Sequence, residues 1–315
     1  MKNSPKKDEL FSYKNGNVFV KIYEDGSLER SCEEDIIRLE HPTSMDVKIT
    51  NFCNPTKDNP ICAYCHESSN LNGKHGDLTN LLQVIKDLPA GVELAIGGGA
   101  PLSHPDIIPF LTELKNKGII ANLTVNQKHL NQDKDLLLYL IGNKLIYGLG
   151  ISYSDSKYLE DVVPIISKTT NVVFHIIMGL NNTSDIDKLY EFSELHNRQC
   201  KVLILGYKEF GYGLNFYLRN KEIEKNKYSW YTKIPMYFKK NNLVLSFDNL
   251  AIKQLKLKRF FTDDAWSTFY MGDDGQYTMY IDAVKKEFAK SSTSGNRVCF
   301  NETSLIKYFT SYINN

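Results

Sequence analysis

The chain has 315 residues, of which 42% are hydrophobic, and its formal net charge is +1 at pH 7. A chain of this length and hydrophobicity can bury a large core, and its overall charge gives no reason to expect a polyanion partner. No stretch approaches the roughly 18 apolar residues of a membrane span, and the N-terminus lacks the apolar segment of a signal peptide. Six cysteines are too few for a disulfide framework, so we expect a cytoplasmic protein without a membrane partner.

Residues 10–30 have the pattern of a β-hairpin. Turn signals at residues 13–17 and 24–27 flank the alternating run 18–23, and alternation between such turns is typical of paired antiparallel strands. We expect residues 1–40 to form an N-terminal hairpin that covers a sheet edge or the mouth of a barrel.

From residue 45 onward, short apolar runs alternate with amphipathic stretches. The apolar runs predict strands at 45–50, 92–96, 119–125, 145–151, 171–177 and 201–205. The amphipathic stretches predict helices near 77–88, 105–117, 132–141, 157–167 and 184–196. This alternation is typical of right-handed βαβ units and a parallel sheet. We therefore expect an α/β fold in which residues 41–213 form a partial (β/α)6 barrel of the TIM type.

The last third of the chain, residues 214–315, has a less regular pattern. Its apolar runs predict strands at 243–247, 266–271 and 277–281, the last two joined as a hairpin by the turn 272–275. Its final stretches predict helices at 284–290 and 305–313. We expect this region to be an α+β extension that closes the barrel.

Three cysteines, Cys53, Cys62 and Cys65, lie in the loop after the first predicted strand of the barrel. Three thiolates can anchor an iron–sulfur cluster and leave one iron without a protein ligand. Together with His66 they would also make a Cys3His zinc site, which is a common use of close cysteine pairs. The cysteines alone leave three interpretations open: a cluster, a zinc site, or thiols without a metal.

Unusual loops follow every predicted strand of the barrel. Glycine-rich or polar segments come after strands two to six, at 97–101, 126, 152–154, 178–182 and 206–213. The carboxyl ends of parallel barrel strands meet at one rim, where active residues lie. This placement favours a cluster over zinc, because a zinc site would have no reason to lie beside glycine-rich loops on each neighbouring strand.

The cysteine loop resembles that of the radical S-adenosylmethionine (radical SAM) superfamily, and the resemblance covers residues 45–213. The superfamily motif is CxxxCxxC with an aromatic residue before the last cysteine. Its second half is matched by Cys62-Ala-Tyr64-Cys65, and the resemblance implies that Tyr64 packs near the adenine. The first half departs from the motif, since eight residues separate Cys53 from Cys62 and the loop is therefore enlarged.

Three further segments resemble the superfamily's SAM-binding motifs. Its Gly-Gly-Glu-Pro motif reads Gly98-Gly99-Ala100-Pro101 here, so backbone carbonyls or another acid must replace the glutamate. The polar residue near the ribose is matched by Ser152 or Ser154, and the apolar-glycine motif of the fifth strand by Ile176–Gly179. The resemblance implies cofactor contacts at Tyr64, Gly98, Gly99, Ala100, Asn126, Ser152, Ser154, Met178 and Lys208.

The resemblance implies a reaction as well as a site. Cys53, Cys62 and Cys65 would ligate a 4Fe–4S cluster whose open iron chelates SAM. An electron from a donor such as flavodoxin or ferredoxin would lead to cleavage of SAM and a 5′-deoxyadenosyl radical that abstracts a substrate hydrogen. The protein would position this chemistry and exclude water. We favour a peptide or protein substrate, because the N-terminal hairpin could add a strand to an extended peptide.

Four single residues outside these motifs are also candidates for particular roles. Cys299 is a candidate catalytic hydrogen donor, because radical peptide epimerases use a lone C-terminal thiol in this way; a buried structural cysteine is the competing interpretation. We expect His66 and Glu67 to form hydrogen bonds that structure the cysteine loop. We expect His175, inside the fifth strand, to be a satisfied core histidine.

Two other functions remain open. Residues 201–260 contain 13 Lys or Arg and 4 Asp or Glu, a net charge of +9, which would suit radical SAM modification of a nucleotide or RNA. The zinc interpretation of the cysteines would instead give a zinc-stabilised binding protein without catalysis.

Overall fold

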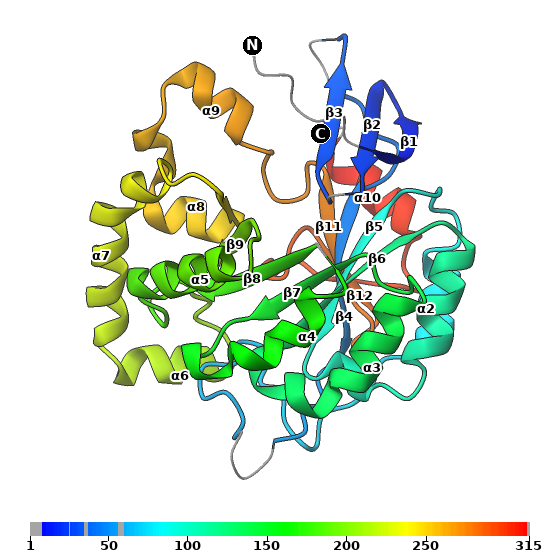
Figure 1. Ribbon diagram of the computed structural model, residues 1–315. Helices are drawn as coiled ribbons and strands as arrows, with labels where there is room; N and C mark the ends of the chain where they lie inside the picture. The colour runs from blue at the N-terminus through cyan, green and yellow to red at the C-terminus, as the bar shows by residue number, and fades with distance from the viewer. Residues whose placement is uncertain (1–7, 25, 35–36, 56–59, 170, 314–315) are drawn as a thin grey trace.

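A ten-stranded sheet dominates the fold, and helices cover its outer face (Figure 1). The computed structural model describes residues 8–24, 26–34, 37–55, 60–169 and 171–313. The strands of this sheet are β4 (Ser44–Thr50), β5 (Glu93–Gly98), β6 (Ile120–Asn126), β7 (Gly148–Ser152), β8 (Val172–Ile177), β9 (Cys200–Leu205), β10 (Leu243–Phe247), β11 (Thr278–Asp282), β12 (Glu287–Ala289) and β13 (Val298–Cys299). The α-helices are α1 (Leu78–Val84), α2 (Ile107–Asn116), α3 (Leu130–Gly142), α4 (Val163–Ile166), α5 (Thr183–Leu195), α6 (Tyr212–Arg219), α7 (Glu222–Tyr237), α8 (Asn249–Leu255), α9 (Asp263–Phe269) and α10 (Leu305–Ile313). None of the helices in the described ranges has both the length and the apolar character needed to cross a bilayer.

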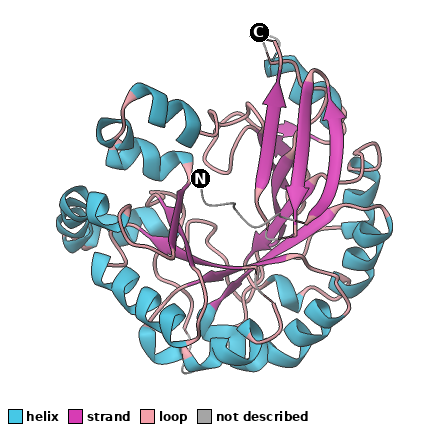
Figure 2. Ribbon diagram, turned by 45° about the horizontal axis from the view of Figure 1, so that its top comes forward, coloured by secondary structure: helices cyan, strands magenta, loops and turns pink. Residues whose placement is uncertain are grey.

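In the described part of the chain, eight neighbouring strands of this sheet are parallel. Their order is β10-β9-β8-β7-β6-β5-β4-β11, and antiparallel β12 and β13 extend the sheet beyond β11. The α/β class and the six strands predicted between residues 45 and 205 are confirmed as β4–β9. The predicted parallel sheet was too small, because β10 joins one end of this set and β11 joins the other. Figure 2 shows helices around the outside of the curved sheet. The partial barrel stays a prediction, as do the domain boundaries at residues 40 and 213.

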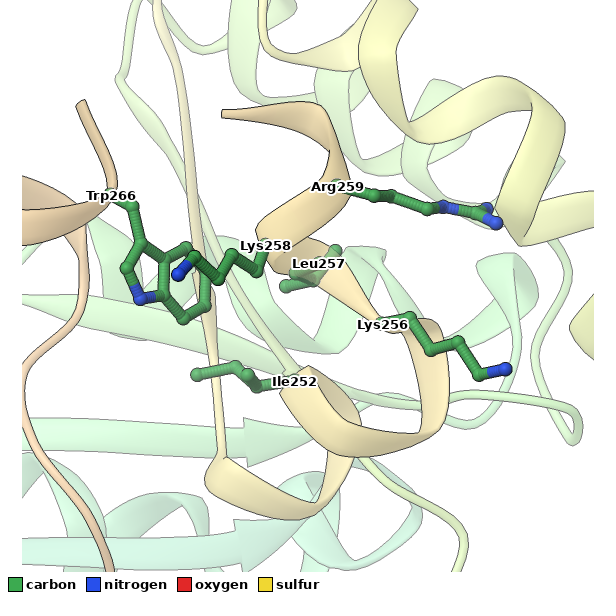
Figure 3. Close-up of a pocket in the computed structure, with 6 residues that line it drawn as sticks. All are labelled: Ile252, Lys256, Leu257, Lys258, Arg259 and Trp266. Atoms are coloured by element: carbon green, nitrogen blue, oxygen red, sulfur yellow. The ribbon is translucent and has the colours of Figure 1, made fainter. Parts of the chain in front are cut away.

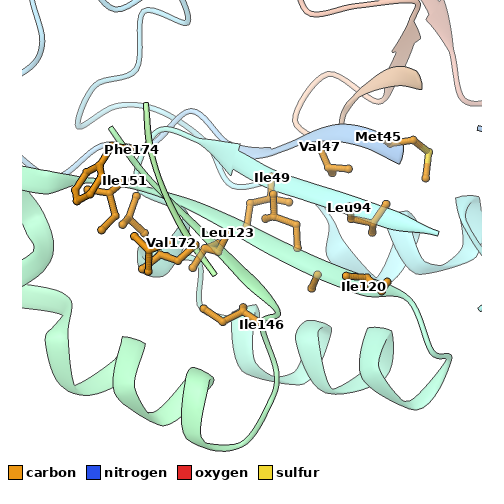
Figure 4. Close-up of a cluster of buried hydrophobic side chains, with 14 of the residues drawn as sticks. Met45, Val47, Ile49, Leu94, Ile120, Leu123, Ile146, Ile151, Val172 and Phe174 are labelled. Atoms are coloured by element: carbon orange, nitrogen blue, oxygen red, sulfur yellow. The ribbon is translucent and has the colours of Figure 1, made fainter. Parts of the chain in front are cut away.

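Side chains of the central strands alternate between two environments. In β8, Val172, Phe174 and Ile176 are buried, whereas the side chains between them are only half-buried. Figure 4 shows Val172 and Phe174 in the hydrophobic cluster that includes residues of β4, β5 and β6. Each buried side chain of this size contributes about 1.5–3 kcal/mol relative to exposure. The hydrophobic core therefore lies on the outer face of the sheet. The inner face has room for a cavity.

The N-terminal appendage is a three-stranded sheet, not a two-stranded hairpin. Its antiparallel strands are β1 (Glu9–Asn15), β2 (Val18–Tyr23) and β3 (Leu28–Cys32). The predicted hairpin is confirmed for β1 and β2, and the turn near Gly26 leads into β3, which the sequence prediction missed. Asn15 is fully buried, and its side chain binds the backbone of Glu40 and His41. These bonds fix the sheet to the segment that enters β4.

Two predictions for the C-terminal region were wrong. The strand predicted at 266–271 is instead α9, which begins after Thr262, whose hydroxyl accepts a hydrogen bond from the Ala265 N–H at 3.3 Å. The helix predicted at 284–290 contains β12, because residues after β11 turn back and pair with it. The carboxylate of Asp282 accepts two backbone N–H bonds in that turn. The predicted strands β10 and β11 and the final helix α10 are confirmed.

Candidate functional site

A cavity of about 760 Å³ opens on the inner face of the sheet. It is lined by the cysteine loop after β4, by the carboxyl ends of β5, β6 and β7, and by the loop after β9. Of the site residues predicted from the sequence, it brings together Cys53, Cys62, Cys65, Tyr64, Gly98, Gly99, Asn126, Ser152, Ser154 and Lys208. The residues predicted at the carboxyl ends of the parallel strands therefore lie around one cavity.

The three cysteines of the loop after β4 face this cavity from one side. The Cys65 N–H donates to the Cys62 carbonyl at 3.0 Å, and this turn brings the two thiols of the Cys62–Cys65 pair onto the same wall. Burial, and to a smaller extent the neighbouring thiols of Cys62 and Cys65, together raise the pKa of the Cys53 thiol to about 11. Mutual effects of this kind require the three sulfur atoms to be near one another. Residues 56–59, in the enlarged part of the loop, lie outside the described residues.

The donor set of this wall fits a cluster held by three cysteines. Cys53, Cys62 and Cys65 are free thiols, and Asn126 Nδ2 donates to Cys62 Sγ at 3.6 Å, as an amide near a cluster sulfur would. Among the described residues, no group of three His, Cys, Asp or Glu side chains is arranged to hold a single metal ion.

A buried ion network holds the end of the cysteine loop. Lys48 of β4 is 5% exposed, and its Nζ lies 2.5 Å from Glu67 Oε2 and 3.2 Å from Asp282 Oδ2 of β11. Tyr280 donates to Glu67 Oε1 at 3.3 Å. Burial alone would raise the pKa of the Glu67 carboxyl. His66 and Lys48 have the larger combined effect, so the pKa is lowered. Glu67 therefore structures the loop, as predicted.

The glycines Gly98 and Gly99, at the end of β5, are required by the chain's own backbone. Gly98 has φ +122°, and a Cβ there would lie 2.1 Å from the Thr50 carbonyl oxygen; at Gly99 it would lie 2.1 Å from that of Phe52. Contact with a ligand is therefore not needed to explain either glycine. At Gly97, which also lines the cavity, the nearest atom is 3.9 Å away. Gly97, near the end of β5, is therefore the position where an added side chain would enter the cavity.

Asn126 and Ser154 connect neighbouring strand ends at the rim. The Ser154 hydroxyl donates to Asn126 Oδ1 at 3.4 Å, and the same oxygen accepts the Lys128 N–H at 3.0 Å. Fully buried Gln127 accepts the Ser154 N–H at 2.8 Å. Because Asn126 also contacts Cys62, this network links the ends of β6 and β7 to the cysteine loop.

Lys208 lies among acidic residues on another wall of the cavity. Its Nζ donates to Ser292 Oγ at 2.9 Å. Asp46 faces the cavity, and removal from bulk water raises its pKa; Lys208 acts against this shift, while Asp248 and Asp274 add to it. Asp248 is also the N-cap of α8, since it accepts the Ala251 N–H at 2.7 Å. Asp46 was not found from the sequence, because it lies inside a strand with no local motif.

The interpretation of His175 as a satisfied core histidine was wrong. Its side chain lines the cavity, in phase with half-buried Val173 and Ile177 along β8. Burial lowers the pKa of His175 to about 4, so the imidazole is neutral near pH 7. The ring covers Gly150 of β7, where a Cβ would lie 2.5 Å from Cε1. Strand alternation was the sequence signal that could have placed His175 inside.

Three predicted site residues do not line the cavity. Met178 is fully buried, because it continues the outward-facing series of β8. Ala100 is buried, and its N–H donates to the Phe52 carbonyl at 2.8 Å. Cys299 is exposed on the short edge strand β13, so the interpretation as a buried structural thiol was wrong. Its thiol does not line the cavity that contains Cys53, Cys62 and Cys65.

A second hollow, of about 480 Å³, lies on the surface near α8 and α9. Figure 3 shows Trp266 and Lys258 on one side of it and Arg259 and Lys256 extending from the other. Ile252 and Leu257 form its apolar floor. None of the residues predicted as site residues lines it.

Comparisons with known proteins show similarity in fold alone. No protein-family model matches the chain, and no curated protein matches it in sequence. Among solved structures, Streptococcus suis SuiB bound to the precursor peptide SuiA is 14% identical, with a TM-score of 0.60 over 87% of this chain and 66% of that one. SuiB bound to S-adenosylmethionine is 14% identical with a TM-score of 0.57, over 87% and 67% of the two chains. A third structure, of SuiB, is 13% identical with a TM-score of 0.60, over 97% of this chain and 87% of that one.

The chain has the fold of SuiB. It spans just under two thirds of the SuiB chain in the peptide complex. The structures of SuiB carry S-adenosylmethionine in one case and a peptide in another, so this fold accommodates both kinds of ligand in that protein.

Proposed function

We propose that the protein is a radical SAM enzyme that holds a 4Fe–4S cluster and SAM in the cavity. The observation that carries the proposal is the convergence of Cys53, Cys62 and Cys65 with Gly97 and Asn126 on one cavity. The fold supports it, because SuiB has also been solved with S-adenosylmethionine. The cysteine and glycine motifs that resemble the radical SAM superfamily support it independently of the fold.

Each part of the cavity wall would have a defined task. The three thiols would ligate the cluster, which when bound would supply the electron that splits SAM into methionine and a 5′-deoxyadenosyl radical. Asn126 would direct its amide toward the sulfur of Cys62, and the Lys48–Glu67 pair would hold the loop in place. The open inner face beside Gly97 would admit the cofactor, and the surrounding sheet would exclude water from it.

We favour a peptide or protein as the substrate. SuiB, which shares the fold, has been solved with a precursor peptide. Epimerisation has no specific support, because exposed Cys299 does not line the cavity. A cytoplasmic location and an electron donor such as flavodoxin or ferredoxin are parts of the same proposal.

Anaerobic purification tests the proposal directly. The protein should contain iron and sulfide, absorb broadly in the visible range, bleach with dithionite, and release 5′-deoxyadenosine from SAM. Cys62→Ala should lose the iron, whereas Cys32→Ala, which changes a half-buried thiol outside the cavity, should retain it. A colourless protein that contains zinc and leaves SAM intact would instead support the binding-protein interpretation.

A further inference from the structure

The side chain of Asn126 directs its amide at one cysteine of the loop after β4. Its Nδ2 donates to Cys62 Sγ at 3.6 Å, while its Oδ1 accepts the Lys128 N–H at 3.0 Å and the Ser154 hydroxyl at 3.4 Å. A backbone N–H can only donate, so the amide atom that faces Lys128 has to be the oxygen. The nitrogen of Asn126 is therefore held toward the sulfur, at the carboxyl end of β6.

A second donor reaches the same sulfur from the cysteine loop itself. The hydroxyl of Tyr64 forms a hydrogen bond with the side chain of Cys62. The ring of Tyr64 packs against α6, where the ring of Phe216 contacts it edge-on with centroids 5.9 Å apart. The adjoining backbone is fixed as well, because the Tyr212 N–H donates to the Cys65 carbonyl at 3.0 Å. Two polar groups from different parts of the fold therefore converge on Cys62.

Hydrogen bonds of this kind have an electrochemical consequence where the cysteine holds an iron–sulfur cluster. Reduction adds one negative charge, which is shared with the sulfur ligands, and hydrogen bonds to these sulfurs are among the factors that set the reduction potential. A hydrogen bond strengthens as its acceptor becomes more negative, so a donor stabilises the reduced state more than the oxidised state. Cys62 and Tyr64 are only half-buried from solvent, but their contact lies on the cavity wall.

We propose that Asn126 and Tyr64 are positioning residues that raise the reduction potential of the cluster through the sulfur of Cys62. The inference rests on the proposed function, because it concerns the cluster that the three cysteines would hold. It gives both residues a task different from the contact with SAM that the sequence resemblance implies. The electron comes from the one-electron donor of the proposed function, and neither residue gains or loses a proton. Both only lower the free energy of the reduced state.

The test compares the reduction potentials of matched variants. Tyr64→Phe removes the hydroxyl donor and keeps the ring, and Asn126→Leu removes the amide donor without adding charge. Tyr212→Phe is the control, because the Tyr212 hydroxyl lies beside the same loop but accepts a hydrogen bond from Asn70 Nδ2, at 3.3 Å. Each protein is reconstituted anaerobically, and its iron and sulfide are measured first. The midpoint potential is then determined without SAM, in a redox titration followed by electron paramagnetic resonance.

Each donor variant should make reduction about tenfold less favourable, which lowers the midpoint potential by about 59 mV for a one-electron couple. Tyr212→Phe should have the wild-type potential. In D2O, electron–nuclear double resonance of the reduced protein should show a weaker coupling to exchangeable deuterons in Tyr64→Phe and Asn126→Leu alone. Tyr64→Phe decides the result by itself if Asn126→Leu retains too little iron.

Three results would overturn the inference. The first is a wild-type potential in both donor variants. The second is a loss of SAM affinity with an unchanged potential in the absence of SAM, which would return Tyr64 and Asn126 to the role that the resemblance implies. The third is an equal shift in Tyr212→Phe, which would show that any change beside the loop alters the potential. A wild-type protein that binds no iron would refute the proposed function instead.

Discussion

Replacing Lys48 by methionine removes one buried positive charge from between two carboxylates. The ammonium is 5% exposed and lies 2.5 Å from Glu67 and 3.2 Å from Asp282, and the Asp282 side chain is 3% exposed. Removing one partner of a buried ion pair costs about 3–5 kcal/mol, because the remaining charge stays desolvated. That is a large part of the roughly 5–15 kcal/mol that stabilises a typical domain. We therefore expect Lys48→Met to lower the free energy of unfolding by about this amount and to loosen the cysteine loop.

Urea unfolding of the metal-free, reduced protein, followed by far-UV circular dichroism, measures this loss. Lys225→Met is the matched control, since Lys225 and Glu222 form an exposed pair at 3.3 Å whose loss should cost less than about 1 kcal/mol. The pKa of Glu67 is lowered in the wild-type protein. Its contribution to the free energy of unfolding is therefore present near neutral pH and is lost as the pH falls. The difference in unfolding free energy between Lys48→Met and wild type should therefore narrow as Glu67 becomes protonated. A loss no larger than that of Lys225→Met would refute the idea that this network holds the loop.

Four further substitutions test individual positions in or near the site. Gly97→Val should fold normally and bind SAM more weakly by calorimetry, whereas Gly98→Ala should lower the melting temperature, because its Cβ would collide with Thr50. The pKa of His175 is lowered to about 4 by burial, so wild-type stability should decline as pH falls from about 6.5 to about 4, by up to roughly 3 kcal/mol. His175→Gln should flatten that decline in urea titrations, and an unchanged slope would place the imidazole in solvent. Cys299→Ala should leave SAM cleavage and product formation unchanged in chromatographic assays, because the thiol does not line the cavity; loss of product alone would restore the donor role.

The central strands could be predicted from the sequence because their signal is local. The strands β4–β9 are short, mainly apolar runs, and a helix follows each of β4–β8 before the next strand begins. The carboxyl-end rule then placed Cys53 and Gly98 on one cavity without any knowledge of side-chain contacts. The local sequence pattern and the order of the strands were sufficient to predict that these residues lie close together.

The errors occurred where structure depends on distant residues. The strand β12 exists because β11 pairs with β4, more than 200 residues earlier, and gives β12 an edge to join. Lys48 of β4 forms its ion pair with Asp282 of the neighbouring strand β11, so no local sequence motif indicates this ion network. The turn signal at 272–275 predicts a strand at 266–271, whereas the N-cap at Thr262 starts helix α9 there.

The cavity exists because small residues occupy the inner face of β5 and β7. Ala95 and Gly97 leave space that longer side chains would fill. At Gly150 the space is taken by the imidazole of His175, and at Gly148 by the amide of Asn122, whose Oδ1 lies 2.8 Å from the position of an added Cβ. Polar groups from neighbouring strands therefore line the interior where apolar side chains would otherwise close it. Burying such groups without partners is costly, so this interior is suited to a polar ligand.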